Sequence, residues 1–213
     1  MFKKYAVLIC IAISVILIFI ASQLYPGGSI LDKNSTGFDW TRNFISNLFG
    51  ANAINGEKNG ARIWAIIGMA FHSVGYGIFF IHMAGKISNK HAAIVLKLVG
   101  VANIAFNFLV VTPLHDLMVT LSSTLSMLGL FYITVFIFRT KLHLFKVCCV
   151  VCMLIFYFAL YLYGSGDWRL LAIMQKLAFA CSMLLILGLE YFTSAEDFVQ
   201  IESKAGKLKS TDQ

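Results

Sequence analysis

A few ionisable side chains of this sequence lie in or next to long apolar segments, where they could support chemistry. His72 stands near the middle of a long apolar run, and the adjacent His115 and Asp116 open another run just after Pro113. Inside a bilayer such groups are costly, and they usually face a bundle interior or a wet cavity. Two imidazoles and a carboxylate suit zinc and leave a position free for water, so one hypothesis is a metal-dependent membrane lipid hydrolase. However, His115 and Asp116 point about 100° apart on a helix, so the sequence favours no metal or other cofactor.

A broad polar face runs along the apolar segment that begins at Asp116. Asp116, Thr120 and Ser123 recur at helical spacing, and a second stripe lies one position away. The second stripe consists of His115, Val119, Ser122 and Ser126. A lipid-facing helix has no use for such a face, so we expect it to point into the bundle. Asn107 and Lys176 lie in the same half of other apolar segments. We predict that both meet this face, with an ion pair between Asp116 and Lys176.

The same residues also have purely structural explanations. Serine and threonine inside apolar helices often bond their own backbone, and a single histidine such as His72 often serves as a hydrogen-bond partner between helices. Asp116 is placed as an N-cap, where its charge meets the positive end of the helix dipole. Lys176 could extend outward to the lipid headgroups instead of pairing. The sequence leaves these alternatives open.

The longest polar segment, residues 25–61, carries a second set of candidates. The string GFDWTRNFISNL places Asp39, Trp40, Arg42 and Asn43 among apolar side chains. In this interpretation Asp39 and Arg42 form a local pair or fold down as a lid over the polar centre, and Trp40 marks the membrane interface. The spacing of nearby apolar residues predicts a short interfacial helix. These residues are Phe38, Phe44, Ile45 and Leu48.

Composition indicates which elements position these residues. Of the 213 residues, 59% are hydrophobic and 13% are charged, against about 25% charged in a typical soluble domain. Because so little polar surface is left, lipid must cover the molecule, and we predict an all-α six-transmembrane-helix bundle with a long first external loop. The predicted spans are residues 5–24, 63–84, 92–111, 117–138, 144–163 and 170–192. Residues 1–195 then form one membrane domain, and residues 196–213 a cytoplasmic tail that is disordered beyond a short helical turn.

The short loops and the adjoining ends of the spans carry unequal numbers of Lys and Arg, and this asymmetry predicts the orientation. Ten such residues fall on the side of the termini and five on the other, so we expect both termini in the cytoplasm. The ten are Lys3, Lys4, Lys86, Lys90, Arg139, Lys141, Lys146, Lys204, Lys207 and Lys209. The five are Lys33, Arg42, Lys58, Arg62 and Arg169. The net charge of +7 follows from these clusters, and no nucleic-acid motif or continuous basic face indicates binding to nucleic acid.

Three strings carry a resemblance to a known group. YPGG and FDWTRNFISNLFG follow the first span, and TPLHDLMVTLSS enters the fourth. In this pattern the chain resembles bacterial six-span membrane proteins of unknown function, similar to the DRAM/Frag/Sfk-type family. Members tend to have a stretch like IS-x-LG after the first helix, matched by residues 45–50 with one extra residue, and a Pro followed by a His near the fourth, matched by Pro113 and His115. The resemblance implies six helices, a bacterial inner (plasma) membrane and no established reaction.

The sequence leaves three functions open. The one we favour is a non-enzymatic membrane protein that binds a lipid or small amphiphile in an outward-facing polar pocket, because polar groups gather beside an aromatic-rich loop. The second is the hydrolase described above. The third is a structural or regulatory protein that acts through partner helices, since glycines in the second span would let another helix approach closely. Membrane lipid is the partner that the sequence indicates, and the oligomeric state is open.

Overall fold

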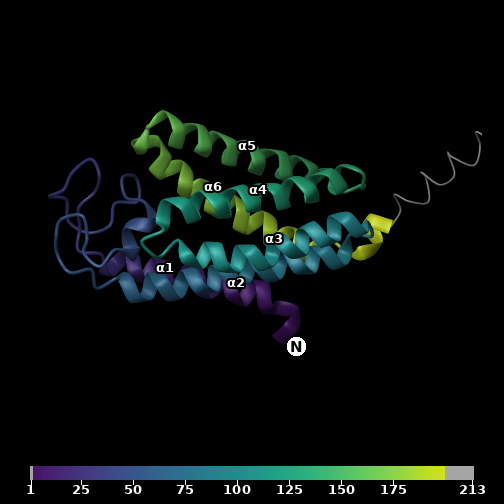
Figure 1. Cartoon of the computed structure of the whole chain (residues 1–213), viewed down its shortest axis with the longest axis horizontal. Helices are drawn as coiled ribbons and strands as arrows, with labels where there is room; N and C mark the ends of the chain where they lie inside the picture. The colour runs from purple at the N-terminus through teal and green to yellow at the C-terminus, as the bar shows by residue number, and fades with distance from the viewer. Residues whose placement is uncertain (1, 200–213) are drawn as a thin grey trace, which may run out of the picture.

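A computed structural model describes residues 2–199 of the chain and contains six long helices (Figure 1). They are α1 (Ala6–Leu24), α2 (Arg62–Lys86), α3 (Lys90–Leu109), α4 (His115–Phe138), α5 (His143–Ser165) and α6 (Trp168–Phe192). All six are long and apolar enough to cross a membrane. No helix end differs by more than two residues from the predicted span. The prediction of an all-α membrane bundle of six helices is therefore confirmed.

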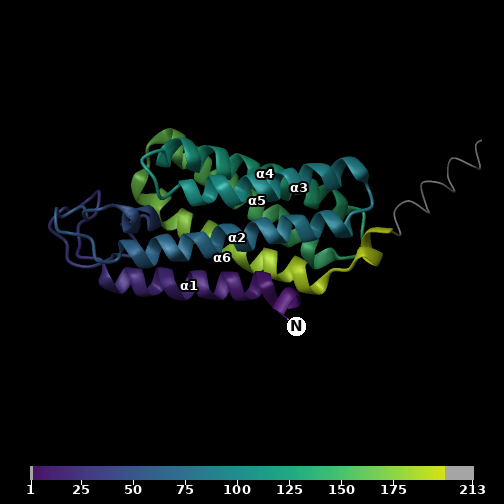
Figure 2. The same cartoon turned by 60° about the horizontal axis from the view of Figure 1, so that its bottom comes forward.

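The helices alternate in direction along the chain, so the bundle has two distinct ends (Figures 1 and 2). The loop end carries the long connection of residues 25–61, and the tail end carries both described ends of the chain. Each helix packs against the next one, and α6 returns to contact α1 and α2. Figure 2 shows α1 running alongside α2 and α6. α2 is therefore the central helix, with α1, α3 and α6 around it.

The tail half of the bundle is tightly packed because glycines let the backbones approach. Gly77 on α2 lies so close to α3 that an added Cβ would stand 2.9 Å from the Gly100 carbonyl oxygen. Gly129 on α4 receives the ring of Phe80, an atom of which would stand 2.4 Å from an added Cβ. Large apolar side chains fill the space around these contacts. They include the fully buried Phe79, Met83, Leu96, Ile133, Ile137 and Leu189.

The long connection between α1 and α2 is held together by hydrogen bonds. Gly27 and Gly28 have positive φ angles of 146° and 82°. A Cβ on Gly28 would stand 2.4 Å from the backbone nitrogen of Asn55, so a glycine is needed there. Asn43 is 0% exposed and donates from Nδ2 to the Gly28 carbonyl oxygen at 2.7 Å. The middle of the connection is thereby fastened to its beginning.

The short helix predicted from Phe38 to Leu48 is wrong for most of its length. The structure has a 3-10 helix, η2, at Ile45–Phe49, and the residues before it are extended or in turns. Asparagine side chains take up backbone donors in this region. The Asn47 Oδ1 accepts from the Phe44 N–H at 2.7 Å, and the Oδ1 of Asn43 accepts from the N–H four residues earlier at 2.9 Å. Such local bonds compete with helical ones, which explains why the apolar spacing alone misled the prediction.

The C-terminal segment begins with ordered structure. Residues 195–199 are helical, and Phe198 is 2% exposed within the core of the tail half. Lys86 fastens the end of α6, because its Nζ donates to the Glu190 carbonyl oxygen at 2.7 Å and to Thr193 Oγ1 at 3.4 Å. The short helical turn expected at the start of the tail is thus packed against the bundle, and residues 200–213 of the predicted tail lie outside the described residues.

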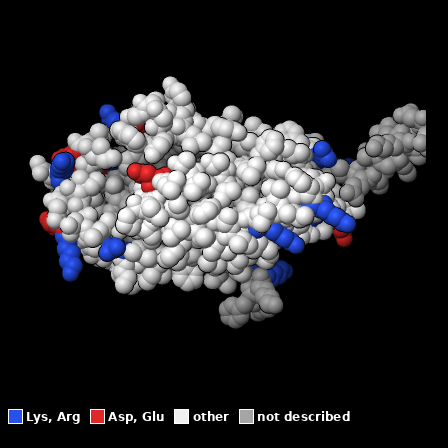
Figure 3. Space-filling view, in the orientation of Figure 1, with Lys and Arg blue, Asp and Glu red and all other residues white. Residues whose placement is uncertain are grey.

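Charged side chains gather toward the two ends of the molecule and leave a largely uncharged belt between them (Figure 3). Large apolar side chains are exposed around the bundle, among them Leu98 at 65%, Leu154 at 61% and Leu184 at 72%. Apolar surface of this extent is unsuited to water and suited to lipid. The belt therefore agrees with the chain being an integral membrane protein.

Candidate functional site: a cavity at the loop end

A cavity of about 450 Å³ lies at the loop end, with α4 on one side and α5 and α6 on the other. It exists because the ring of helix contacts runs α3–α4, α4–α5 and α5–α6, whereas α4 and α6 do not pack closely against each other. Side chains of α2 and α3 line its inner wall, and residues 44–47 with Phe49 close it toward the loop. The cavity is thus built from five helices and the segment around η2.

The polar wall of the cavity comes from α4. The predicted polar face lies against the cavity over its whole length. Its members there are His115, Asp116, Val119, Thr120, Ser122, Ser123 and Ser126. Two hydroxyls also bond their own helix: Thr120 Oγ1 donates to the Asp116 carbonyl oxygen at 3.0 Å, and Ser122 Oγ to the Val119 carbonyl oxygen at 3.3 Å. Because a hydroxyl that donates still has lone pairs, both remain acceptors for a ligand.

The ring of His115 is oriented by the chain just before α4. Its Nδ1 lies 2.8 Å from the Val110 carbonyl oxygen. Since a carbonyl oxygen can only accept, Nδ1 carries the proton, and Nε2 of the neutral ring is the acceptor. His115 lines the cavity. It therefore contributes an oriented imidazole rather than a freely rotating one.

The inner wall contains two polar side chains from the predicted set. His72 on α2 is 5% exposed and packs its ring against Tyr76 at 4.2 Å and Phe179 at 5.2 Å between centroids. Asn107 on α3 is 8% exposed, lines the cavity and has no hydrogen-bond partner for its Nδ2 among the described residues. A buried amide without a partner costs free energy, so Asn107 is a group that a ligand could satisfy.

The opposite wall is aromatic and apolar, and the sequence did not predict it. Its apolar members are Phe156, Ala159, Leu160 and Tyr163 of α5 and Trp168, Leu171, Ala178 and Phe179 of α6. Two polar residues of α6, Gln175 and Ser182, also line it, and they are hydrogen-bonded to the Ile45 N–H and to the Tyr76 hydroxyl. Tyr163 and Trp168 meet edge to face, with ring centroids 5.7 Å apart. α5 is apolar on all sides, so no periodicity in its sequence distinguishes the side that faces the cavity from the side that faces lipid.

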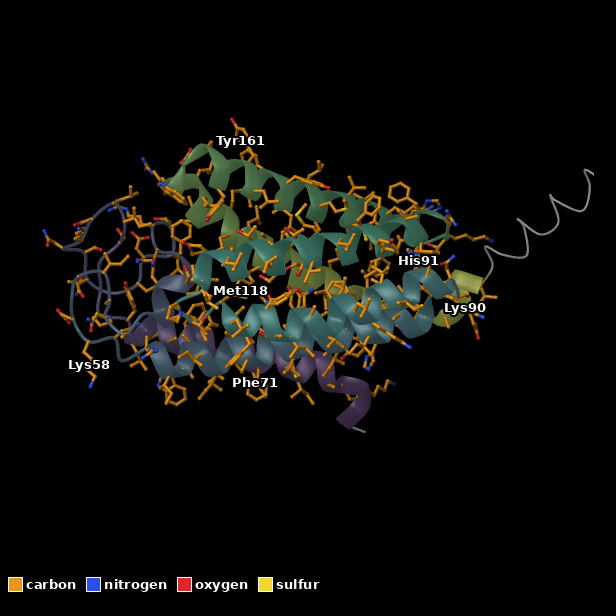
Figure 4. The ribbon with its side chains drawn as sticks, in the orientation of Figure 1. Lys58, Phe71, Lys90, His91, Met118 and Tyr161 are labelled. Atoms are coloured by element: carbon orange, nitrogen blue, oxygen red, sulfur yellow. The ribbon has the colours of Figure 1, made fainter. Side chains whose placement is uncertain are left out.

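The mouth of the cavity lies between α4 and α5. These helices are joined at the tail end and diverge toward the loop end (Figure 1). Cavity-lining residues on both are exposed: Asp116 and Thr120 on α4, and Leu160 at 38% and Tyr163 at 42% on α5. Figure 4 shows Tyr161, by contrast, pointing away from the bundle on the outer side of α5. The mouth therefore opens sideways.

The predicted ion pair between Asp116 and Lys176 is wrong. Lys176 donates from Nζ to the carbonyl oxygens of Asn43 and Ala172, each at 2.5 Å, and does not line the cavity. The backbone carbonyl oxygen of Asn43 therefore takes the position that the carboxylate of Asp116 was expected to occupy. The neighbouring Gln175 accepts from the Ile45 N–H at 3.0 Å. Together these bonds fasten the segment that closes the cavity to α6.

The four loop candidates lie outside the cavity lining. Asp39 and Arg42 form the expected local pair, with 3.5 Å between Oδ2 and Nε. Hydrogen bonds from the Thr41 hydroxyl and backbone N–H hold the pKa of Asp39 below its ordinary value. Trp40 is 42% exposed and packs edge to face on a neighbouring phenylalanine at 5.1 Å. Asn43 bonds both the start of the loop and Lys176 of α6, so it fixes the segment that closes the cavity without lining the cavity itself.

The three residues considered as zinc ligands do not form a metal site. Among the described residues, no group of three or more His, Cys, Asp and Glu side chains is arranged to hold a metal ion. His72 packs among aromatic rings, while His115 and Asp116 are successive residues on α4. The geometry therefore gives no support to the zinc-dependent hydrolase.

No family model matches the chain, and comparison with curated proteins and with solved structures finds no similar protein. The resemblance to the DRAM/Frag/Sfk-type group stays a prediction. Function has to be inferred from the cavity itself.

Proposed function

We propose that this protein binds a lipid or small amphiphile in the cavity at the loop end. The observation that carries the proposal is the division of the cavity into a polar wall on α4 and an aromatic and apolar wall on α5 and α6. A volume of about 450 Å³ lies within the range of small-molecule sites. A ligand with a polar group and a hydrocarbon portion would satisfy both walls at once. A purely polar solute would leave the α5 and α6 wall without a partner.

The lateral mouth supports the same proposal. Because Leu160 and Tyr163 border the mouth on an apolar helix, a ligand could pass between membrane and cavity without crossing water. A lipid headgroup could then occupy the polar wall while its chain stays between α4 and α5.

We further propose that the tail end lies in the cytoplasm of a bacterium and that the bundle spans its inner (plasma) membrane. Basic residues at the tail end support this orientation by the positive-inside rule. They include Lys4, Lys86, Lys90, Arg139, Lys141 and Lys146. The loop end, and with it the mouth of the cavity, would then belong to the outer leaflet. The resemblance to bacterial six-span proteins supports the choice of membrane.

The proposal is tested by native mass spectrometry of the protein purified in a mild detergent. We expect the wild-type protein to retain one phospholipid from the expression membrane. In Ser123→Leu, a larger side chain fills the cavity, so the affinity for lipid should fall by about tenfold, or about 1.4 kcal/mol of binding free energy, and the retained fraction should fall with it.

Thr124→Leu is the matched control, because Thr124 is the next residue on α4, is exposed and does not line the cavity. It should retain lipid as the wild-type protein does. Equal retention by all three proteins would show that the lipid binds elsewhere, and no retention in a folded, monodisperse wild-type sample would contradict the proposed function.

A further inference from the structure

Among the residues that the structure describes, the side chains that line the cavity include one carboxylate and no Lys or Arg. The carboxylate is that of Asp116. Lys176 lies on α6, across the cavity from α4, and directs its ammonium group to the carbonyl oxygens of Asn43 and Ala172. An anionic headgroup would therefore meet a carboxylate with no basic side chain to offset it. Such an arrangement disfavours anions and attracts cations.

The carboxylate of Asp116 is itself available to a ligand. It is exposed at the mouth of the cavity, and neither ion pair formed by the described residues involves it. Its backbone carbonyl oxygen, not its side chain, accepts the bond from Thr120. On the other side of the mouth stand Tyr163 and Trp168, both 42% exposed. Aromatic rings that face a carboxylate across a cavity mouth favour an ammonium group between them, because ring faces attract cations.

A second feature of the cavity is a buried amide without a hydrogen-bond partner within residues 2–199. The amide of Asn107 lines the cavity near the end of α3, and its Nδ2 has no partner among the described residues. Rotation about the Cβ–Cγ bond of Asn107 exchanges the positions of Oδ1 and Nδ2, so the amide can present its N–H donors to the cavity. Asn107 is the third-last residue of α3 and Asp116 the second residue of α4, which places both at the loop end. An oxygen of a phosphodiester or ester would satisfy the free donor.

We infer that the cavity takes a zwitterionic amphiphile of the phosphoethanolamine class, with its ammonium group at Asp116 and an acceptor oxygen at Asn107. This inference rests on the lipid-binding function proposed above and specifies the headgroup. The acyl chains leave through the mouth between α4 and α5, alongside Leu160 and Tyr163. An anionic phospholipid of the same chain length fits the hydrocarbon part equally well but lacks the positive group.

The test compares three lipids with identical acyl chains on the delipidated full-length protein: phosphatidylethanolamine, phosphatidylglycerol and diacylglycerol. Binding is measured by native mass spectrometry in detergent at one protein concentration and a series of lipid concentrations. We expect phosphatidylethanolamine to bind about tenfold more tightly than phosphatidylglycerol. In Asp116→Asn that preference should shrink to about twofold or less, while binding of diacylglycerol should be unchanged. The unchanged binding also shows that the variant is folded.

Glu57→Gln is the matched control, because Glu57 is an exposed acid of the loop end that does not line the cavity. It should keep the wild-type preference, which separates a local effect of Asp116 from a change in net charge. Equal binding of phosphatidylethanolamine and phosphatidylglycerol to the wild-type protein would overturn the headgroup inference and leave lipid binding intact. A preference that survives in Asp116→Asn would also overturn it. Failure of all three lipids to bind would instead contradict the proposed function.

Discussion

In the tail half of the bundle, α2 and α3 pack backbone against backbone and α4 packs against the ring of Phe80, whereas in the loop half helices of the same bundle surround a cavity. The tail half has Gly77, Gly100 and Gly129 at its helix contacts, and each leaves no room for even a Cβ without a shift of its neighbour. The loop half has hydroxyl, amide and imidazole side chains on the corresponding helices. Small residues thus close one half of the bundle, while polar residues and a fastened loop keep the other half open.

The comparison also shows two ways of fixing the ends of membrane helices. At the tail end the Lys86 ammonium group donates to the carbonyl oxygens of Leu189 and Glu190 in the last turn of α6, and Phe198 packs into the apolar core. At the loop end a connection of irregular structure satisfies its own backbone through asparagine side chains such as Asn43. The first arrangement combines packing with hydrogen bonds from a lysine of a neighbouring helix, and the second depends on hydrogen bonds within the loop. Their responses to substitution should therefore differ in kind.

The largest effect is expected at the tail half. In Gly77→Val the new Cβ alone would stand 2.2 Å from Ile104 Cγ1 and 2.9 Å from the Gly100 carbonyl oxygen. α2 and α3 would have to separate, at a cost of about 3 kcal/mol or more. Thermal unfolding in detergent should show a large fall in Tm. Gly85→Val is the control, since nothing lies within 4 Å of a Cβ on Gly85. A comparable fall in both variants would mean that the close approach of α2 and α3 is not what stabilises this half.

A smaller and more local effect is expected from Asn43→Ala. This change removes the bonds to the Gly28 carbonyl oxygen and to the Asp39 N–H, and leaves buried backbone groups unpaired. The cost is about 1–3 kcal/mol for a buried group without its partner. Hydrogen exchange should accelerate in residues 25–61 and stay unchanged in the core of α2 and α3. Asn34→Ala, at an exposed position of the same loop, should exchange like the wild-type protein. Faster exchange in the helices as well would show that the two ends are not independent.

The smallest effect concerns the pH dependence of the loop. Because the hydroxyl and N–H of Thr41 lower the pKa of Asp39, the ionised carboxylate stabilises the folded loop. This contribution is present above the unfolded pKa of about 4 and is lost as the pH falls through the lower pKa of the folded state. Protection factors of residues 38–44 in the wild-type protein should exceed those in Asp39→Asn at pH 6, and the difference should shrink as the pH is lowered through the folded pKa of Asp39. A difference that does not change with pH would assign the stabilisation to another group.

The helices and the polar face of α4 could be predicted from the sequence because each depends on a pattern within one segment. The length of an apolar run gives a span, and Asp116, Thr120 and Ser123 at helical spacing give a face. The partner of Lys176 could not be predicted in this way. It is the carbonyl oxygen of Asn43, a backbone atom 133 residues away in sequence, and any residue type would have supplied it.

The aromatic wall was missed for a different physical reason. In water, burial separates the two sides of a helix into polar and apolar stripes, but lipid and protein interior are equally apolar. Nothing in the sequence of α5 therefore distinguishes Tyr163, which lines the cavity, from Tyr161, which is 66% exposed on the outside. The polar wall of the cavity could therefore be predicted from the sequence, and the apolar wall could not.

α4 and α5 are connected by residues 139–142 and diverge from there, so a tilt of α5 about this connection moves its far end. α5 has 23 residues and is therefore about 34 Å long. A tilt of α5 by about 5° about residues 139–142 moves its far end by about 3 Å, roughly the diameter of a water molecule. Transmembrane helices adjust their tilt to the thickness of the bilayer. A change in bilayer thickness that altered the tilt of α5 would therefore also change the width of the mouth.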